Sequence, residues 1–517
     1  MHFFQLMEGL EILSRSGGPC AFQADITGVD YDSRRIQPGN LFVAMRGETT
    51  DGNDYIEAAI KRGAVGVVSD SAAQQPKPGM PWLQVRHGRR ALATLGANFF
   101  GHPTRNLKIT GITGTNGKTT TAFLLSQIIK SVGGGEPVLI GTIEYHFAGQ
   151  VIPAPHTTPE PLDLQRIFAQ ATDARLGNLA ASEAVMEVSS HALAQERIYG
   201  LQYDVAVFTN LSRDHLDYHK NMEDYFAAKQ LLFQGCGAPP PRVAVINSDE
   251  EAGRRLIAVS RAAGSELLTY GLNSGDFRAE AVRLSRDETM FQLRTPKEQL
   301  PVRSPVVGRV NVYNLLAAIA AAYARGAPLP AIVDAAHRCH SAPGRFQRVD
   351  CGQPFAVVVD YAHTDDALRN LTAVAREFVS AQKHSGRVIT LFGCGGDRDK
   401  SKRPLMAAAA AGSDYVILTS DNPRSEDPME IIAQALPGLQ SSSTPYQVEP
   451  DRRHAINLAI TQAQPGDIVL IAGKGHEKSQ TTRSGSAHFD DVEVAREALH
   501  AAGYGIVGAA SKAADLT

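Results

Sequence analysis

Short apolar runs alternate along this chain with longer segments whose apolar residues recur every three or four positions. The runs are rich in β-branched residues and end in glycine-rich or charged turns, a pattern typical of strands that lead into helices in a parallel α/β sheet. The predicted strands occupy residues 107–113, 137–143, 184–188, 204–209, 242–246, 355–360, 387–392, 414–419 and 467–472. The pattern therefore predicts an α/β protein.

Turn-rich stretches at residues 100–106 and 340–346 separate these sets of strands. A chain of 517 residues is long enough for about three domains of ~150 residues each. We expect an N-terminal domain over 1–105, a central domain over 106–342 and a C-terminal domain over 343–517. The small, polar residues at the very C-terminus are expected to form a frayed tail.

Composition limits the class of protein. With 43% hydrophobic and 20% charged residues the chain resembles ordinary globular proteins, and a net charge of -3 gives no reason to expect a nucleic-acid partner. The five cysteines are scattered without a CxxC pair, which indicates neither a disulfide framework nor a zinc site and fits a reducing cytoplasm.

No segment has the pattern of a membrane anchor or a signal peptide. Glu8 and Glu11 interrupt the apolar N-terminus, where a signal peptide needs a basic start and an unbroken apolar core. The most apolar later stretch, 315–324, is far shorter than the ~20 residues that a bilayer requires. We expect a cytoplasmic protein without membrane insertion.

A glycine loop between a predicted strand and a predicted helix has the features of a phosphate-binding loop. In such a loop backbone N–H groups and the helix N-terminus hold phosphates, a lysine meets the terminal ones, and a hydroxyl ligates magnesium. The strict GxxxxGK[ST] pattern fails because Ile112 stands where the first glycine would be, so the loop is a shorter variant. Its residues are Gly114, Thr115, Asn116, Gly117, Lys118, Thr119 and Thr120. An ordinary strand-to-helix turn with a surface lysine is the alternative.

A second polar cluster follows two other predicted strands. Glu187 stands at the end of one strand, and Asp214, His215, Asp217 and His219 lie just past another. Ligands of an open parallel sheet bind outside the carboxyl ends of its strands, so these side chains are expected to share a crevice with the glycine loop. Thr119 and Glu187 would make a sensible magnesium site.

The residues alone leave two roles in this cluster open. Magnesium prefers oxygen ligands, so His215 is either a ligand or a histidine satisfied within its loop. Lys229, in a helical pattern, would by itself be taken for a surface lysine.

Seven motifs in a fixed order resemble those of the Mur ligases, the ATP-dependent amide-forming enzymes of peptidoglycan precursor synthesis. They are TGTNGKTTT, MEVSSHAL, FTNLSRDHLDYH, GRVNVYNLLAA, PGRF, DYAH and GKGHE, and they span nearly the whole chain. The resemblance implies an N-terminal domain for the UDP end of the substrate, a central P-loop-type ATPase domain with a parallel sheet, and a C-terminal Rossmann-like domain that brings the amino acid.

The resemblance also implies roles for residues that match the motifs. Lys118 and the glycine loop would hold ATP, Thr119 and Glu187 would bind one magnesium ion, and His215 with Lys229 would serve a second, the lysine as a carbamate made from carbon dioxide. The expected ATP contacts outside the loop are Asn311, Asn314, Arg345 and Asp360. The expected contacts of the UDP-muramoyl dipeptide are Ser33, Thr157, Thr158, Ser189, Gln195 and Arg197.

The HTTP, SSHALAQER and DNPR stretches resemble most the family members that add a diamino acid to UDP-N-acetylmuramoyl-L-alanyl-D-glutamate. If the four C-terminal runs are parallel strands, their carboxyl ends carry the expected diamino-acid contacts Arg398, Asp421, Asn422, Pro423, Arg424, Gly473 and Glu477. A bidentate guanidinium at Arg424 suits the distal carboxylate of meso-diaminopimelate, which L-lysine lacks. In the family, DNPR accompanies diaminopimelate.

Several alternatives remain open at this point. They are a lysine-adding ligase of the same family, a folylpolyglutamate synthetase, and a non-catalytic nucleotide-binding subunit. His156 replaces a frequent asparagine and Asp365 a usual proline, so the chain departs from the family pattern at these two positions. We expect a monomer that binds only small molecules, and no general base for the incoming amine is evident.

Overall fold

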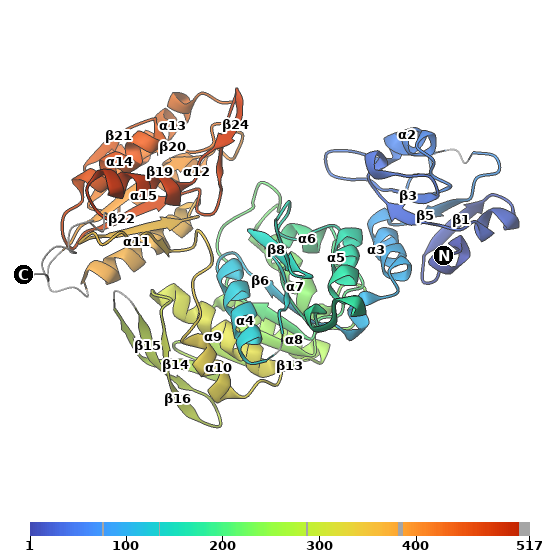
Figure 1. Cartoon of the computed structure of the whole chain (residues 1–517), viewed down its shortest axis with the longest axis horizontal. Coiled ribbons are helices and arrows are strands. Elements are labelled where there is room, and N and C mark those ends of the chain that lie inside the picture. The colour runs from blue at the N-terminus through green and yellow to red at the C-terminus, as the bar shows by residue number, and fades with distance from the viewer. Residues whose placement is uncertain (75–76, 134, 286–287, 381–385, 506–517) are drawn as a thin grey trace, which may run out of the picture.

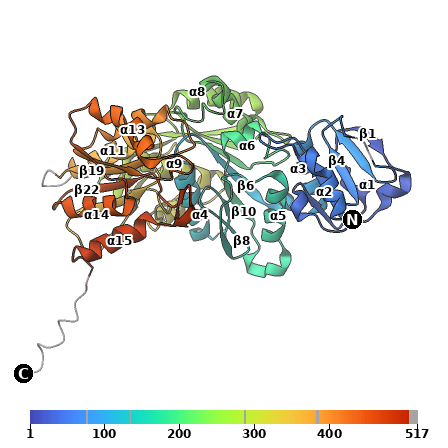
Figure 2. The ribbon, with the colours of Figure 1, turned by 90° about the horizontal axis from the view of Figure 1, so that it is seen from above.

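The computed structural model describes residues 1–505 except 75–76, 134, 286–287 and 381–385. Three sheets, each with its own helices, follow one another along the chain. Figures 1 and 2 show the central sheet and its helices between the N-terminal part, in blue, and the C-terminal part, in orange and red. The predicted three-part α/β architecture is therefore confirmed. Among the described residues, no helix combines the length and the apolar character needed to cross a bilayer.

The N-terminal part is a five-stranded sheet in the order β1-β5-β4-β3-β2, with only β1 antiparallel to its neighbour. Phe3, Leu41 and Leu92 bury their side chains in its core. Its strands are β1 (Ile12–Ser16), β2 (Gly28–Asp30), β3 (Asn40–Ala44), β4 (Gly66–Ser69) and β5 (Trp82–Val85). Its helices are α1 (Phe3–Leu6), α2 (Ile56–Lys61) and α3 (Gly88–Phe99), with 3-10 turns η1 (Pro19–Gln23), η2 (Ser33–Arg35), η3 (Gly52–Tyr55) and η4 (Pro103–Asn106).

The central sheet has eleven strands in the order β16-β15-β14-β13-β12-β11-β6-β10-β7-β8-β9. Its middle is parallel, and both edges are antiparallel. The strands are β6 (Lys108–Thr113), β7 (Val138–Ile140), β8 (Glu144–Phe147), β9 (Gln150–Pro153), β10 (Glu183–Glu187), β11 (Val205–Phe208), β12 (Val243–Asn247), β13 (Glu266–Gly271), β14 (Phe277–Leu284), β15 (Thr289–Arg294) and β16 (Gln299–Ser304). The helices are α4 (Lys118–Ser131), α5 (Pro161–Ala171), η5 (Ala174–Leu179), α6 (Ser190–Ala194), α7 (Met222–Gln234), α8 (Glu251–Ala263), α9 (Arg309–Ala324) and α10 (Leu329–Ala336).

The parallel strands of the central sheet are buried on both faces. In β11, Val205 and Val207 belong to the apolar cluster that contains α4 and α9, whereas Ala206 and Phe208 belong to the cluster on the opposite face. Side chains alternate along a strand, so a continuous apolar run means that helices cover both faces. This explains why these strands were readable as unbroken runs.

The C-terminal part is a six-stranded sheet in the order β17-β18-β22-β19-β20-β21, flanked by helices, with a separate two-stranded hairpin. Strands β18, β22, β19 and β20 are parallel, as the sequence predicted. The strands are β17 (Gln347–Arg348), β18 (Ala356–Asp360), β19 (Val388–Cys394), β20 (Tyr415–Ser420), β21 (Tyr446–Val448), β22 (Ile468–Ala472), β23 (Ser479–Thr482) and β24 (Gly485–His488). The helices are α11 (Asp365–Ser380), α12 (Lys402–Ala410), α13 (Pro428–Gln440), α14 (Arg452–Gln462) and α15 (Asp491–Ala501).

All nine predicted strands are present. The largest difference is that β7 ends at Ile140 rather than at residue 143, because the chain leaves the sheet there and the backbone N–H of Thr142 donates to Glu187. The antiparallel edges β8–β9 and β14–β16 were not predicted. Burial in β15 alternates between buried and more exposed residues, so this strand lacks the continuous apolar run of the central strands. The domain boundaries at 105 and 342 stay predictions; the first falls in η4 and the second after α10.

Candidate active site

The glycine loop lies where the chain passes from β6 into α4. Strand β6 is paired with β10 on one side and β11 on the other, so the carboxyl ends of three parallel strands meet at this loop. Gly114 and Gly117 have φ angles of 152° and 87°. A Cβ atom at Gly114 would overlap Thr209, and one at Gly117 would overlap Asn314, so both positions require glycine.

Lys118 and Thr119, the first residues of α4, face the same loop. The Nζ atom of Lys118 donates to the backbone carbonyls of Gly114 at 2.9 Å and Thr115 at 2.8 Å. Burial, opposed by the nearby Glu187 carboxylate, lowers the pKa of Lys118. The hydroxyl of Thr119 donates to Glu187 Oε2 at 3.0 Å. A cation and a hydroxyl thus stand at a helix N-terminus, as phosphate binding requires.

Glu187 is fully buried at the end of β10 and is held by hydrogen bonds. Its Oε1 atom accepts from the backbone of Thr142 at 2.8 Å, and Oε2 accepts from the hydroxyls of Thr142 and Thr119. Hydroxyl and carboxylate oxygens are ligands that magnesium prefers. No three His, Cys, Asp or Glu side chains cluster as metal ligands in the described part of the chain. An ion here would therefore take further ligands from water and substrate phosphate.

His215 lies beside Asp214 in the loop after β11. It has a left-handed backbone with a φ of 53°, and its Nε2 atom is 3.5 Å from Asp214 Oδ2. Burial and the nearby lysines lower the pKa of His215 to about 4, so the imidazole is neutral at pH 7. Asp214 also pairs with Lys402 at 2.9 Å. Burial alone would raise the pKa of Asp214, but His215 and Lys402 lower it to about 2.

Lys229 is not a surface lysine. It points from α7 into the protein, is 1% exposed, and its Nζ atom donates to the carbonyl of Gly114 at 2.9 Å. The same atom lies 4.5 Å from the centroid of the Tyr225 ring. Burial and the neighbouring charge of Lys118 lower the pKa of Lys229 well below its usual value. The two lysines therefore converge on one carbonyl of the glycine loop.

The predicted substrate residues line four neighbouring cavities. The central one has a volume of about 410 Å³ and contains the glycine loop, Thr157, Thr158, Ser189 and His215. It shares Gln195 and Arg197 with an N-terminal cavity.

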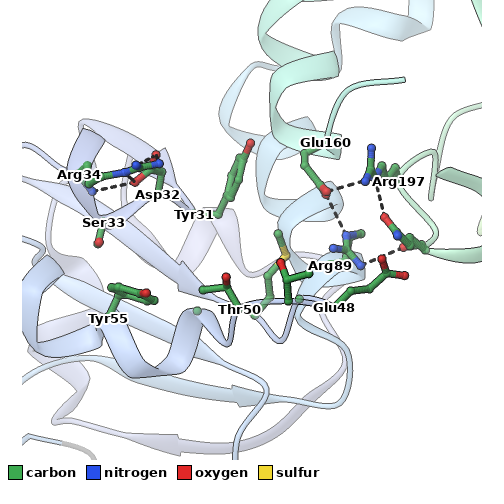
Figure 3. A pocket seen from close by; sticks show the side chains of 15 residues that line it. Tyr31, Asp32, Ser33, Arg34, Glu48, Thr50, Tyr55, Arg89, Glu160 and Arg197 are labelled. Carbon is green, nitrogen blue, oxygen red and sulfur yellow. Dashed lines mark hydrogen bonds and ion pairs between the residues drawn. The ribbon is translucent and has the colours of Figure 1, made fainter. Parts of the chain in front are cut away.

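The N-terminal cavity has a volume of about 580 Å³ and lies between the first two parts of the chain (Figure 3). Ser33 lines it at the start of η2, as predicted. Arg89 and Arg197 both contact the carboxylate of Glu160, at 2.9 and 3.2 Å. Figure 3 shows this group at the end of the cavity that faces the central sheet, with Glu48 beside it. Gln195 and Arg197 thus connect the two cavities.

A smaller cavity on the other side of the glycine loop contains the predicted ATP residues Asn311, Asn314, Arg345 and Asp360, together with Gly117. Burial raises the pKa of Asp360, although its carboxylate accepts hydrogen bonds from the backbone of Phe346 and Ala362. The Arg345 guanidinium lies 4.7 Å above the centroid of the Tyr361 ring and donates to Thr119 at 3.4 Å.

The fourth cavity, of about 270 Å³, opens at the carboxyl ends of the C-terminal strands. The structure brings six of the seven predicted diamino-acid residues to it: Arg398, Asp421, Asn422, Arg424, Gly473 and Glu477. Pro423 is not among the lining residues. Asp214, His215, Tyr361 and His363 line both this cavity and the central one. Arg398 and Arg424 therefore face one space, which the sequence could not establish.

Several lining residues were not predicted. Tyr361 and His363 follow Asp360 in the DYAH motif, so their position beside a predicted ATP residue was the available signal. Glu48 and Arg89 come from the N-terminal part, where no local motif pointed to them. Lys402 follows the charged turn that carries Arg398, so charge near a strand end was the available signal.

Three models of protein-family domains match this chain, one in each of its three parts. The model of the Mur ligase family, catalytic domain, matches residues 25–100; that of the Mur ligase middle domain matches 112–322; that of the Mur ligase, glutamate ligase domain, matches 344–475.

Two similar relatives and one solved structure carry the name UDP-N-acetylmuramoyl-L-alanyl-D-glutamate–2,6-diaminopimelate ligase. The protein of Solibacter usitatus is 51% identical over 95% of this chain and 97% of its own length. That of Geobacter metallireducens is 45% identical over 93% of this chain and 95% of its own. The solved structure has 34% identity and a TM-score of 0.67, and it covers 98% of this chain and 99% of its own.

Proposed function

The chain belongs to the Mur ligase family, and we infer that it is the ATP-dependent ligase that adds meso-2,6-diaminopimelate to the D-glutamate of UDP-N-acetylmuramoyl-L-alanyl-D-glutamate. One structural observation supports this function independently of the relatives' names. The central cavity shares lining residues with each of the other three, so a nucleotide-sugar peptide, ATP and an amino acid can meet at the glycine loop.

The first chemical step is the activation of a carboxylate. The D-glutamate side chain is unreactive toward an amine at neutral pH, so its oxygen attacks the γ-phosphorus of ATP, ADP leaves, and an acyl phosphate forms. Lys118 would offset the negative charge that gathers on the phosphoryl oxygens. Its nearness to the helix N-terminus of α4 supports this role, because both present positive charge to the same site.

The side chains around the glycine loop fit magnesium. Thr119 and Glu187 offer oxygen ligands 3.0 Å apart in a buried setting, and we assign them to one ion. Bound there, the ion would supply further neutralisation of the transferring phosphoryl group. His215 is neutral and has a lone pair to offer, which supports its assignment to a second ion.

Lys229 would serve that second ion as a carbamate. Its lowered pKa supports the modification, because only a neutral amine attacks carbon dioxide. The lone pair of the neutral amine forms the N–C bond as one C=O π bond of carbon dioxide opens, the nitrogen then loses one proton, and the neutral amine becomes an anionic carbamate. The change would also place an anion beside Lys118, which shares the Gly114 carbonyl with Lys229 and whose charge disfavours a second cation there.

The second step joins the amine of diaminopimelate to the acyl carbon, and phosphate leaves. Arg424 and Arg398 would bind the distal carboxylate, while Asp421 and Glu477 would face an ammonium group. Asp214 and His215 line the passage between this cavity and the central one, which supports entry of the amine from that side. Closure of the C-terminal part over the central part would exclude water from the acyl phosphate.

The proposal extends to the organisation of the protein. It includes domains over 1–105, 106–342 and 343–517, a monomer, and a cytoplasmic location, where ATP and nucleotide-sugars are available. Ser33, Thr157, Thr158 and Ser189 are assigned to the muramoyl dipeptide by their positions in the N-terminal and central cavities.

Product analysis tests the function. Purified protein with ATP, magnesium and the UDP-muramoyl dipeptide should release ADP only when diaminopimelate is added, and the product mass should equal the two substrates joined with loss of water. Turnover with L-lysine but not with diaminopimelate would point to the lysine-adding alternative. Failure with every acceptor would favour the non-catalytic alternative.

A further inference from the structure

A lysine that has no role in the steps above lies against residues of the fourth cavity, the one that opens at the carboxyl ends of the C-terminal strands and is called the amino-acid cavity from here on. Lys474 follows Gly473 in the loop after β22, and its side chain is completely buried. Its Nζ atom lies 3.0 Å from Asn422 Oδ1, 3.4 Å from Asp421 Oδ1 and 3.7 Å from Glu477 Oε2. All three partners line the cavity, whereas Lys474 does not.

These contacts fix the orientation of the Asn422 amide. Oδ1 accepts from Lys474 and also from the backbone N–H of Thr481, each at 3.0 Å, and Nδ2 donates to Glu477 Oε2 at 2.8 Å. The ammonium group and the backbone N–H can only donate hydrogen bonds, so Lys474 and Thr481 together determine which end of the amide is the oxygen. The Nδ2 end must then face Glu477.

The β23–β24 hairpin contacts the turn at residues 421–424 from the side opposite Lys474. The side-chain amide of Gln480, in β23, donates to the carbonyl of Asp421 at 2.6 Å. The carbonyl of Thr481, in the same strand, accepts from the backbone N–H of Arg424 at 3.0 Å. The second bond matters because Arg424 has a φ of 52°, a left-handed conformation unusual for a residue with a side chain. The turn is thus supported from both sides.

The buried ammonium group of Lys474 also sets the net charge of the part of the cavity formed by Asp421 and Glu477, called the cavity floor below. Asp421 and Glu477 carry two negative charges near one another, and Lys474 compensates one of them. The floor is left with one net negative charge, which matches one ammonium group of an amino acid. Arg398 and Arg424 then remain available for a carboxylate.

We propose that Lys474 is a positioning residue for the amino-acid substrate, acting through Asn422, Asp421 and Glu477 together with the β23–β24 hairpin. This inference rests on the proposed function, because it takes the C-terminal cavity as the diaminopimelate site. It assigns a part in diaminopimelate binding to a residue that does not line the cavity.

Lys474→Met tests the proposal, with Lys478→Met as the matched control. Lys478 is exposed, lies four positions further along the same loop and loses the same charge. Because charge-assisted hydrogen bonds are lost, the KM for diaminopimelate should rise about tenfold or more in Lys474→Met. The KM values for ATP and for the UDP-muramoyl dipeptide should change less than about twofold in both variants, since Asp421, Asn422 and Glu477 line none of the other three cavities.

A second readout does not depend on turnover. Hydrogen exchange of the peptide covering residues 419–428 should become faster in Lys474→Met than in wild type, and remain unchanged in Lys478→Met. Wild-type protein that fails to use diaminopimelate would refute the proposed function, while the exchange comparison would still decide the role of Lys474 in holding the turn.

Two outcomes would overturn the inference. One is an unchanged KM for diaminopimelate together with unchanged exchange; the other is an equal rise in all three KM values, which indicates a general loss of structure. If Lys474→Met does not fold, Gln480→Ala carries the same test from the half-buried hairpin side, with a rise of about threefold expected for one lost hydrogen bond. An unchanged KM in that variant would contradict the proposal.

Discussion

Replacement of Arg424 by alanine should abolish most of the preference for diaminopimelate over L-lysine that the proposed site implies. The Arg424 guanidinium lies in the amino-acid cavity, and its Nη1 atom donates to the carbonyl of Gly396 at 2.8 Å, which leaves most of its donors for a ligand. Removing a bidentate contact with a carboxylate costs about 3 kcal/mol, so kcat/KM for diaminopimelate should fall by about a hundredfold.

The comparison with L-lysine isolates this contact. Lysine has no distal carboxylate, so its kcat/KM should change by less than about threefold, and the ratio between the two acceptors should fall by about a hundredfold. Steady-state ADP release at varied acceptor concentration gives both values. Arg483→Ala is the matched control, because that exposed arginine also contacts the turn, at the carbonyl of Ser425, but does not line the cavity.

A structural role for Arg424 predicts a different result. If the guanidinium served only to hold Gly396, both acceptors would lose activity equally and the ratio would not move. An unchanged ratio in Arg424→Ala, or an equal loss in Arg483→Ala, would refute the assignment of the distal carboxylate to this residue.

Three further changes probe the central part. Lys229→Ala should lose activity by about a hundredfold or more and regain part of it with a short-chain carboxylate, because the proposed carbamate would supply an anionic ligand. Full activity of this variant in steady-state assays would refute the proposed carbamate. Gly117→Ala should raise the KM for ATP at least about tenfold, since a φ of 87° and overlap with Asn314 disfavour any side chain; an unchanged KM would contradict this. The pKa of Asp214 is about 2 in the folded protein, against a usual value of 3.8. Ionised Asp214 should therefore stabilise the folded protein by about 2 kcal/mol above about pH 4, and this stabilisation should be lost as the pH falls toward 2. Urea unfolding of wild type and Asp214→Asn should therefore differ at pH 6 and converge at pH 2, whereas a constant difference would exclude the pairing with Lys402.

The sequence predicted those parts of the fold that leave a pattern within a short stretch of the chain. Strands β6, β10 and β11 are buried on both faces, so their apolar runs were unbroken, and the glycine loop stands directly after one of them. Ligands bind at the carboxyl ends of parallel strands, and this rule predicted that Glu187 and His215 lie near the loop. Both residues line the central cavity together with the loop.

The parts that escaped prediction depend on contacts between distant segments. Lys229 looks like a surface residue in its helix, and only the packing of α7 against the glycine loop buries it. Arg89 and Glu160 meet between two parts of the chain, 71 positions apart. Lys474 belongs to a quoted motif, yet no pattern of spacing could show that it lies beneath Asn422.

The most direct test of the central claim is a structure of the protein with diaminopimelate bound. The distal carboxylate is predicted to accept two hydrogen bonds from the Arg424 guanidinium, with an ammonium group of the ligand facing Asp421 and Glu477. A diaminopimelate molecule bound elsewhere, or bound in this cavity with its distal carboxylate away from Arg424, would contradict the account.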